Sequence, residues 1–465
     1  MPSRLPPVAV IGAGFSGTMA AIQLSRTLPP ERPILLCERS AAFARGLAYA
    51  TGCPEHLLNV RTANMSAFPD APDHFVRWLE TCGIDDAPSV RATPAGIFAA
   101  RGLYGRYLTD LLREVVAPPD GAPRLLLEND TVTDLVPDGA GFRLALAVGR
   151  SRPVAGVILA CGNLRGRRPD THYAEDPWDD APLDALRDDL PVLIVGTGLT
   201  MVDAVAALRR RGFSGPVVAV SRRGLLPQVH APAAPRTVPL PDDAARRSLP
   251  ALTAHLRAEI ARAAGSGEDW RGIIDGLRPV TASLWRTLPL AEQRRFLRHL
   301  RPFWDAHRHR MAPTAAEIVA REREAGTLTV VRGRVVAVAD QAGFATVTIR
   351  ERGAGATREI RAQRIIDASG IAGVAATDDP LLRRLMGRGL IRPDLHGLGL
   401  AVTEDLALMH PGGDAPHPLW ALGPLLRGTF WECTAVPDIR VQAVDLARTV
   451  AARLAAVPDA RRRHG

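Results

Sequence analysis

Two glycine-rich turns contain the residues of this sequence that are best suited to chemistry. Residues 12–17 (GAGFSG) follow the apolar run 8–11, and residues 196–201 (GTGLTM) follow the apolar run 192–195. Between a strand and a helix, such glycines allow a tight turn and close approach to a pyrophosphate, which the helix N-terminus stabilises. Two turns predict two dinucleotides, and the usual reason to bind two is to pass electrons between them. The residues predicted to hold them are Gly12, Gly14, Phe15, Ser16, Gly17, Gly196, Gly198, Leu199 and Thr200.

The residues that end the second strand of each unit indicate which dinucleotide would bind. Glu38 ends the strand expected over residues 33–37, where this kind of fold places an acid on the adenosine ribose. The alternative interpretation of Glu38 is a solvated carboxylate at a strand end. In the second unit, Ser221, Arg222 and Arg223 follow the strand 217–220, and a basic pair there favours the 2′-phosphate of NADP over the bare ribose of NAD. Met201 replaces the third glycine, which predicts a weaker second site.

The elements around these turns alternate between strands and helices. Helices are expected over residues 14–27, 70–82 and 103–116, and from 242 to 324 with breaks at four prolines. Strands are expected over 124–128, 131–136, 142–148 and 154–159, as a small antiparallel layer that returns to a parallel sheet, and again over 328–331, 334–338, 346–350 and 364–367. Residues 46–69 lack periodicity but carry little charge, which predicts a loop that wraps a ligand.

Composition excludes several classes of function. All 58 basic residues are arginine, and the net charge of +9 is spread thinly among acids. Since no aromatic stacking platform accompanies that charge, we expect no nucleic-acid partner. The absence of lysine excludes a Schiff base, a pyridoxal phosphate anchor and a Walker A lysine. No apolar run approaches the ~20 residues of a membrane span, and the first apolar run leads directly into the first turn, so we expect a cytoplasmic protein without a membrane partner.

Cysteines and histidines do not form a metal or dithiol pattern. The five cysteines are scattered without a close pair, which argues against structural zinc and against a disulfide reductase. His307 and His309 are two positions apart in a helical stretch and do not share a face, so we expect no metal site. No Ser-His-Asp or paired-carboxylate constellation can be assembled, and the catalytic residues remain unknown.

These motifs make the chain resemble the FAD-NAD(P)-binding proteins of the two-dinucleotide flavoprotein superfamily. The resemblance also rests on residues 46–51, 56–60, 65–70, 101–108, 221–227, 307–313, Gly423 and 431–440. It implies FAD in the first unit and NADPH in the second. His56 and Asn59 in the wrapping loop could then reach the isoalloxazine, with a scaffold role for His56 as the alternative. The strand-end turns at Gly162 and Gly370, together with Gly423, are further expected cofactor contacts. A C-terminal helix that begins at Pro437 could direct its positive end at the flavin.

The resemblance implies an α/β fold with two Rossmann-like dinucleotide-binding domains, of which the FAD domain is discontinuous, and a helical insertion. The expected boundaries are 1–188 and 361–465 for the FAD domain, 189–240 and 326–360 for the NAD(P) domain, and 241–325 for the insertion. We expect an FAD-dependent oxidoreductase reduced by NADPH. Its activity could be that of a monooxygenase, similar to an N-hydroxylase, on a small polar substrate. The alternative is a non-catalytic flavoprotein that senses its cofactors and binds a partner. The sequence leaves homo-oligomer formation open.

Overall fold

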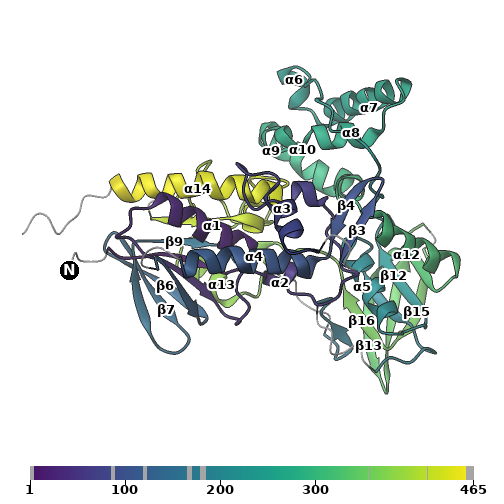
Figure 1. The fold of residues 1–465 in the computed structure, drawn as a ribbon. Coiled ribbons are helices and arrows are strands. Elements are labelled where there is room, and N and C mark those ends of the chain that lie inside the picture. The colour runs from purple at the N-terminus through teal and green to yellow at the C-terminus, as the bar shows by residue number, and fades with distance from the viewer. Residues whose placement is uncertain are drawn as a thin grey trace, which may run out of the picture.

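The computed structural model describes residues 5–84, 89–118, 123–164, 170–178, 185–353, 355–415 and 417–456. Figure 1 shows one sheet covered by the long helices α1 and α14, a second sheet beside it, and a group of helices, α6 to α10, that projects away from both. Within the described ranges, no helix is both long and apolar enough to cross a membrane.

The first domain is built on a five-stranded parallel sheet with the order β17-β9-β1-β2-β5. Its strands are Val8–Ile11 (β1), Ile34–Glu38 (β2), Leu125–Asn129 (β5), Gly156–Leu159 (β9) and Leu419–Ala421 (β17). Its main helices are Phe15–Thr27 (α1), Arg101–Val116 (α4) and Val436–Ala456 (α14). Residues Phe15 to Leu24 of α1 are buried around the whole helix, because β1, β2, α4 and α14 all pack against it.

Smaller elements complete the first domain. A three-stranded antiparallel sheet consists of Val132–Asp138 (β6), Gly141–Leu146 (β7) and Ser151–Val154 (β8), and a hairpin consists of Val90–Thr93 (β3) and Gly96–Ala99 (β4). The short helices are Gly46–Tyr49 (α2), His74–Thr81 (α3) and Pro380–Gly387 (α13), with 3-10 turns at Thr62–Asn64, Val374–Ala376 and Gly423–Leu426. The expected four-stranded antiparallel layer is therefore wrong in part, because β5 pairs in parallel with β2 and β9 in parallel with β1.

The second domain is built on a seven-stranded sheet with the order β10-β16-β11-β12-β13-β14-β15. Its strands are Ala174–Glu175 (β10), Val192–Val195 (β11), Val217–Ser221 (β12), Leu328–Gln341 (β13), Phe344–Glu351 (β14), Thr357–Ala362 (β15) and Arg364–Asp367 (β16). Helices Leu199–Arg210 (α5) and Pro313–Glu324 (α12) pack against each other. The two strands expected over 328–331 and 334–338 form one strand, β13, whose pairing with β14 shifts register between Val335 and Ala337.

Strand pairing and core packing move three of the expected domain boundaries. The boundary at residue 361 falls inside β15, and the next strand, β16, pairs with β11 of the second sheet. β10 also joins this sheet, although it lies within the expected first segment 1–188. Ala315 and Val319 of α12 are buried in the core that includes Val192 and Ile194, so α12 belongs to the second domain and not to the insertion.

The helical insertion contains the remaining helices and a core of its own. They are Asp243–Arg246 (α6), Leu249–Gly265 (α7), Trp270–Gly276 (α8), Arg278–Thr287 (α9), Leu290–Arg295 (α10) and Arg301–Arg308 (α11), with a π-helical turn at Phe296–Leu300. Pro279 and Pro302 lie in the first turns of α9 and α11, and Pro289 caps α10. The expected breaks are thus helix starts, where proline's missing N–H costs no intrahelical hydrogen bond.

Candidate functional site

The first glycine turn has the backbone geometry that a pyrophosphate requires. Gly12 has a φ of +97°, and a Cβ atom there would lie 2.5 Å from the Ala160 carbonyl oxygen at the end of β9. A Cβ atom on Gly17 would lie 1.8 Å from the Gly12 oxygen, so the helix and the turn are packed as closely as only glycine permits. The N-cap of α1, Gly14, offers no side-chain cap, and the first turn holds no acid. Its backbone N–H groups are therefore available for an anion.

The second glycine turn repeats this arrangement on the second sheet. Gly196 has a φ of +117°, and its Cβ atom would lie 2.1 Å from the Ala368 oxygen at the end of β16. Gly198 caps α5 without a side-chain hydrogen bond, and a Cβ atom there would meet open space. The residues that follow it in the motif, Leu199 and Thr200, are half-buried in the first turn of α5. Met201, in place of the third glycine, is fully buried.

Two further glycines stand where β9 and β16 end beside these turns. Gly162 and Gly370 have φ values of +70° and +108°, and an added Cβ atom would meet open space at both. Each domain therefore pairs a glycine turn with a neighbouring turn that leaves room above the strand ends. In open parallel sheets this is the place where ligands bind.

Glu38 lies directly over the first turn. Its carboxylate accepts hydrogen bonds from the backbone N–H of Ala13 at 2.9 Å and from the N–H of Ser40 at 3.0 Å. Since Ala13 is part of the glycine turn, the carboxylate stands at the end of β2 facing the turn, as a group that binds ribose hydroxyls would.

The second domain has arginines where the first has its acid. Arg222 is exposed after β12, and Arg223 donates to the His299 oxygen at 3.2 Å and covers the Phe303 ring, so it contacts the insertion. Arg332 was missed by sequence reasoning because it lies on β13, far along the chain. It pairs in register with Ser221 and is exposed. The cations available for a 2′-phosphate are thus Arg222 and Arg332, whereas Arg223 is partly engaged.

Part of the segment 46–69 contacts the second domain, and the segment is not entirely loop, since it contains α2 and the 3-10 turn Thr62–Asn64. The His56 ring is 2% exposed, with one nitrogen 2.8 Å from the Thr51 hydroxyl and the other 3.1 Å from the Asp203 backbone oxygen. The backbone oxygen of Asn59 accepts from the His230 ring at 3.0 Å. These contacts favour the scaffold role for His56, and they join the backbone at Asn59 to the second domain.

A buried ion pair strengthens the same junction. Arg101, at the start of α4, lies 3.0 Å from the carboxylate of Asp203 on α5. Burial raises the pKa of Asp203, and Arg101 and His56 oppose that rise. Burial also lowers the pKa of His230 to about 4, so this ring is neutral near pH 7. The junction is therefore a polar but largely desolvated contact between the two dinucleotide domains.

The C-terminal segment packs against the first turn. Gly423 has a φ of +78°, and a Cβ atom there would lie 2.3 Å from the Ser16 hydroxyl of α1. The thiol of Cys433 donates to the Gly423 oxygen at 3.5 Å, and Pro437 lies in the first turn of α14. Asp438, in the same turn, accepts two hydrogen bonds from Arg278 of the insertion, at 3.0 and 2.7 Å. The start of α14 thus connects the first domain to the insertion.

A buried glutamate just before α14 is a second connection that sequence reasoning missed. Glu432 has a φ of +41°, and its carboxylate accepts from the Trp304 indole at 2.6 Å. Arg308 and His309 each approach it to 3.6 Å. Burial raises the pKa of Glu432, but the cationic neighbours outweigh burial and lower it to about 2. The sequence signal was the run 307–310 (HRHR), whose acidic partner is distant in the chain.

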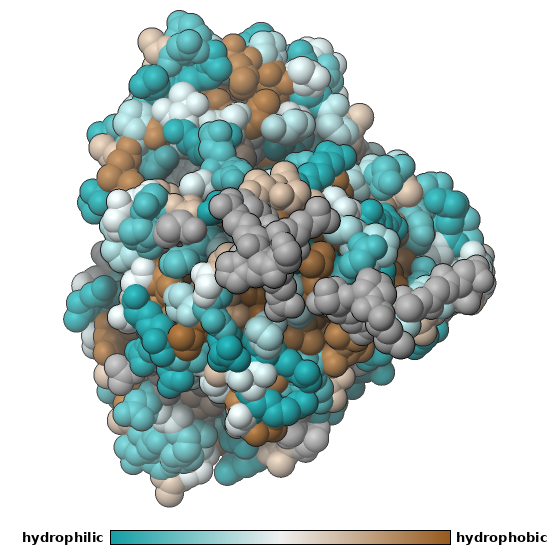
Figure 2. Space-filling model, turned by 90° about the vertical axis from the view of Figure 1, so that its left-hand side faces the viewer, coloured by the Kyte–Doolittle hydropathy of each residue, from teal (hydrophilic) through white to brown (hydrophobic). Residues whose placement is uncertain are grey.

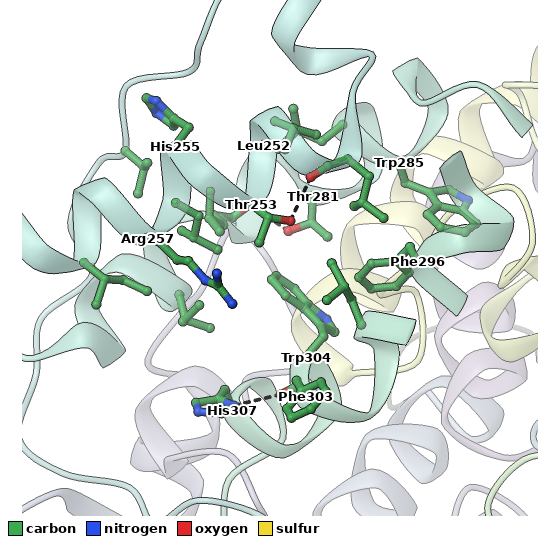
Figure 3. Close-up of a pocket in the computed structure, with 18 of the residues that line it drawn as sticks. Leu252, Thr253, His255, Arg257, Thr281, Trp285, Phe296, Phe303, Trp304 and His307 are labelled. Atoms are coloured by element: carbon green, nitrogen blue, oxygen red, sulfur yellow. Dashed lines mark hydrogen bonds between the residues drawn. The ribbon is translucent and has the colours of Figure 1, made fainter. Parts of the chain in front are cut away.

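The insertion encloses a cavity of about 620 Å³ with a mainly apolar lining. Figure 3 shows Leu252, Thr253 and Arg257 of α7 facing Phe303, Trp304 and His307 of α11, with Trp285 and Phe296 along one side. Trp431 of the C-terminal segment also lines it. His307 bonds to the Phe303 backbone oxygen, and no group of three His, Cys, Asp or Glu residues in the described part of the chain could hold a metal.

Comparisons with known proteins agree with this geometry. Residues 9–164 match the family described as FAD-NAD(P)-binding. Uncharacterized proteins of Mycobacterium tuberculosis and Mycobacterium bovis are 23% identical over 526 residues, which cover 96% of this chain and 95% of each relative.

Solved structures extend the likeness to the whole fold. The L-lysine 6-monooxygenase of Pseudomonas syringae shares 16% identity at a TM-score of 0.66, covering 97% of this chain and 100% of that one. The ornithine N-hydroxylase of Kutzneria sp. 744 shares 12% at 0.63, covering 96% and 99%, and the thioredoxin reductase of T. acidophilum shares 10% at 0.52, covering 97% and 99%. The expected fold class is confirmed: residues 9–164 carry the FAD-NAD(P)-binding family signature, and the whole chain has the two-dinucleotide flavoprotein fold.

Proposed function

We propose that this protein is an FAD-dependent oxidoreductase that takes its electrons from NADPH. The observation that carries the proposal is the pair of matching glycine turns, at Gly12 and Gly196, each beside an uncapped helix N-terminus. One turn alone would fit a dehydrogenase without flavin. Two turns in adjoining domains fit an enzyme that passes electrons between two bound dinucleotides.

The residues of the chain divide between the two cofactors. The turn at residues 12–17 would hold the FAD pyrophosphate and Glu38 its adenosine ribose, with the start of α14 as a source of positive potential for the flavin. The turn at residues 196–200 would hold NADPH, with Arg222 and Arg332 on its 2′-phosphate. Bound FAD supplies two-electron chemistry between NADPH and an acceptor.

We further propose that the acceptor is oxygen and that the enzyme is a monooxygenase. The proteins of this fold named above include a lysine monooxygenase and an ornithine N-hydroxylase. A thioredoxin reductase also shares the fold, but the five cysteines here lie too far apart in sequence for its type of close dithiol. The balanced reaction takes substrate, O₂, NADPH and a proton to hydroxylated substrate, water and NADP⁺. We also propose a cytoplasmic location, where NADPH would be supplied.

Anaerobic addition of NADPH to the purified protein, followed by its visible spectrum, tests the oxidoreductase proposal. We expect a yellow protein that bleaches. A protein that stays yellow would refute NADPH-driven reduction and favour the cofactor-sensing alternative. Gly196→Ala is the matched variant: its methyl group would collide with the Ala368 oxygen, so we expect it to retain flavin but to lose bleaching. Oxygen consumption that yields only hydrogen peroxide with every substrate tried would refute the monooxygenase assignment.

A further inference from the structure

The cavity in the insertion has the size of a small-molecule site and is open to solvent on one side. Its volume of about 620 Å³ lies within the range of about 300–1,000 Å³ that ligand pockets occupy. Helices α7, α8, α9 and α11 supply most of its wall. Leu240 and Phe303, 37% and 41% exposed, line it where it meets solvent. Figure 2 shows apolar surface on the upper part of the molecule, where Figure 1 places the insertion.

The lining is apolar and aromatic, and its polar groups are mostly satisfied by the protein. Four tryptophans contribute to it: Trp270, Trp285, Trp304 and Trp431. The hydroxyls of Thr253 and Thr281 donate to the backbone oxygens of Leu249 and Leu277, at 2.7 and 2.8 Å. The ring nitrogens of His255 and His307 lie 2.7 and 2.8 Å from the backbone oxygens of Pro239 and Phe303. Both hydroxyls and one nitrogen of each ring therefore already have a partner within the protein.

Arg257 and Trp431 carry hydrogen-bond donors that have no partner among the described residues. Figure 3 shows the Arg257 side chain extended from α7 into the cavity toward Trp304. Arg257 is exposed, and it makes no ion pair or hydrogen bond with another described residue. The indole N–H of Trp431 is buried without a hydrogen-bond partner among the described residues. None of the described residues that line the cavity is acidic. A cationic amine would therefore meet an arginine and no carboxylate, whereas an anion would complement the lining.

The cavity is also joined to the first dinucleotide turn. Trp431 lies in its wall, and two residues later the Cys433 thiol donates to the Gly423 oxygen. Gly423 in turn packs on the Ser16 side chain of the glycine turn. A molecule in the cavity would thus contact the segment that closes the predicted flavin site.

We propose that the cavity binds an amphipathic carboxylate: an apolar body among the tryptophans and an anionic group on Arg257. This differs from the small polar substrate expected from the sequence. The assignment of this ligand as the enzyme's substrate rests on the proposed function. The binding of the ligand to the cavity does not.

Tryptophan fluorescence of the full-length protein provides the binding assay, because four of the seven tryptophans line the cavity. The probes are decanoate, decan-1-ol, decylamine and L-ornithine, each below its aggregation concentration. We expect decanoate to quench the fluorescence in a saturable way. We expect decan-1-ol to bind more weakly than decanoate, and the two amines to bind most weakly. Equal or tighter binding of decylamine or ornithine would overturn the proposal, and so would the absence of saturable binding.

A pair of arginine variants tests the role of Arg257. Arg257→Met keeps most of the apolar stem and removes the charge, and we expect about a three- to tenfold loss of decanoate affinity with little change for decan-1-ol. Arg247→Met is the control, because Arg247 is exposed in the same insertion but does not line the cavity. Equal decanoate affinity in both variants would refute the assignment of the anionic group to Arg257.

The anaerobic NADPH experiment separates this inference from the proposed function. Decanoate binding without flavin bleaching would leave the ligand class standing and refute the reductase. Flavin bleaching without decanoate binding would support the reductase and refute the proposed ligand class. If both hold, decanoate is expected to increase aerobic NADPH consumption, and Arg257→Met is expected to raise the decanoate concentration needed for that increase, whereas Arg247→Met is not.

Discussion

Replacement of Glu432 by glutamine isolates the charge of the buried carboxylate between the C-terminal segment and the insertion. The Glu432 side chain is 8% exposed, and glutamine keeps its shape, its backbone conformation and an acceptor for the Trp304 indole. Its folded-state pKa lies near 2 against an ordinary value of 4.5. At about 1.36 kcal/mol per pKa unit, this difference corresponds to about 3 kcal/mol of stability, in the range found when a buried ion pair loses one partner.

The pH dependence of this stabilisation has a definite sign. Because the folded pKa of Glu432 is lowered, its contribution is present above about pH 4.5 and is lost as the pH falls through about 2. For His309, burial lowers the pKa, but Glu432 outweighs burial and raises it above 6.5. The contribution of His309 is therefore present below pH 6.5 and is lost as the pH rises through the raised value.

Urea denaturation, monitored by tryptophan fluorescence, measures the stability that Glu432→Gln removes. At pH 6 we expect Glu432→Gln to lower the unfolding free energy of the insertion by about 3 kcal/mol. We also expect it to weaken the wild-type decline in stability that occurs as the pH rises through the raised pKa of His309. Glu404→Gln is the control, because Glu404 pairs with Arg286 at 2.9 Å but its side chain is 88% exposed, so its loss changes stability little. Equal stability of the two variants at pH 6 would refute the reasoning.

Four further substitutions, in three tests, probe the glycine turns, the predicted 2′-phosphate site and the domain junction. Gly17→Ala should yield a colourless protein, because its methyl group would lie 1.8 Å from a backbone oxygen, whereas Gly198→Ala, in open space, should purify yellow; equal flavin content would contradict this. Arg222→Ala should lower kcat/KM for NADPH by about tenfold and leave that for NADH unchanged, and a parallel loss for both would remove Arg222 from the 2′-phosphate. Arg101→Met should lower the free energy of unfolding by about 3 kcal/mol at pH 8. Because the loss of Arg101 raises the pKa of buried Asp203 further, the loss of unfolding free energy should become smaller as the pH falls through that pKa. A loss of unfolding free energy that does not change with pH would contradict this prediction.

Local sequence patterns predicted the elements next to the glycine turns well. The apolar runs 8–11 and 192–195 coincide with β1 and β11, and the predicted strand 364–367 coincides with β16. The C-terminal helix starts one residue before the predicted Pro437. In each case an apolar run beside a glycine, or a proline in a first helical turn, carries a local signal.

Partners that are distant in the chain could not be predicted in this way. β15 was missed because its sequence, TREIRA, alternates weakly and is mostly exposed. The parallel pairing of β5 with β2 depends on a neighbour about 90 residues away. The same limit applies to the site: Arg332 reaches Ser221 only through strand register, and Glu432 meets the 307–310 run only in the folded chain. Periodicity describes one segment and carries no record of which other segment it will meet.

The discontinuity of the first domain has a consequence for synthesis on the ribosome. β17 is an edge strand of the first sheet, and α14 covers α1, yet both come from the last part of the chain. While the ribosome is still making the second domain and the insertion, β9 lacks its β17 neighbour and α1 has an uncovered apolar face. The nascent first domain therefore exposes aggregation-prone surface until β17 and α14 have been made. Loading of FAD is then expected only after α14 has emerged from the ribosome.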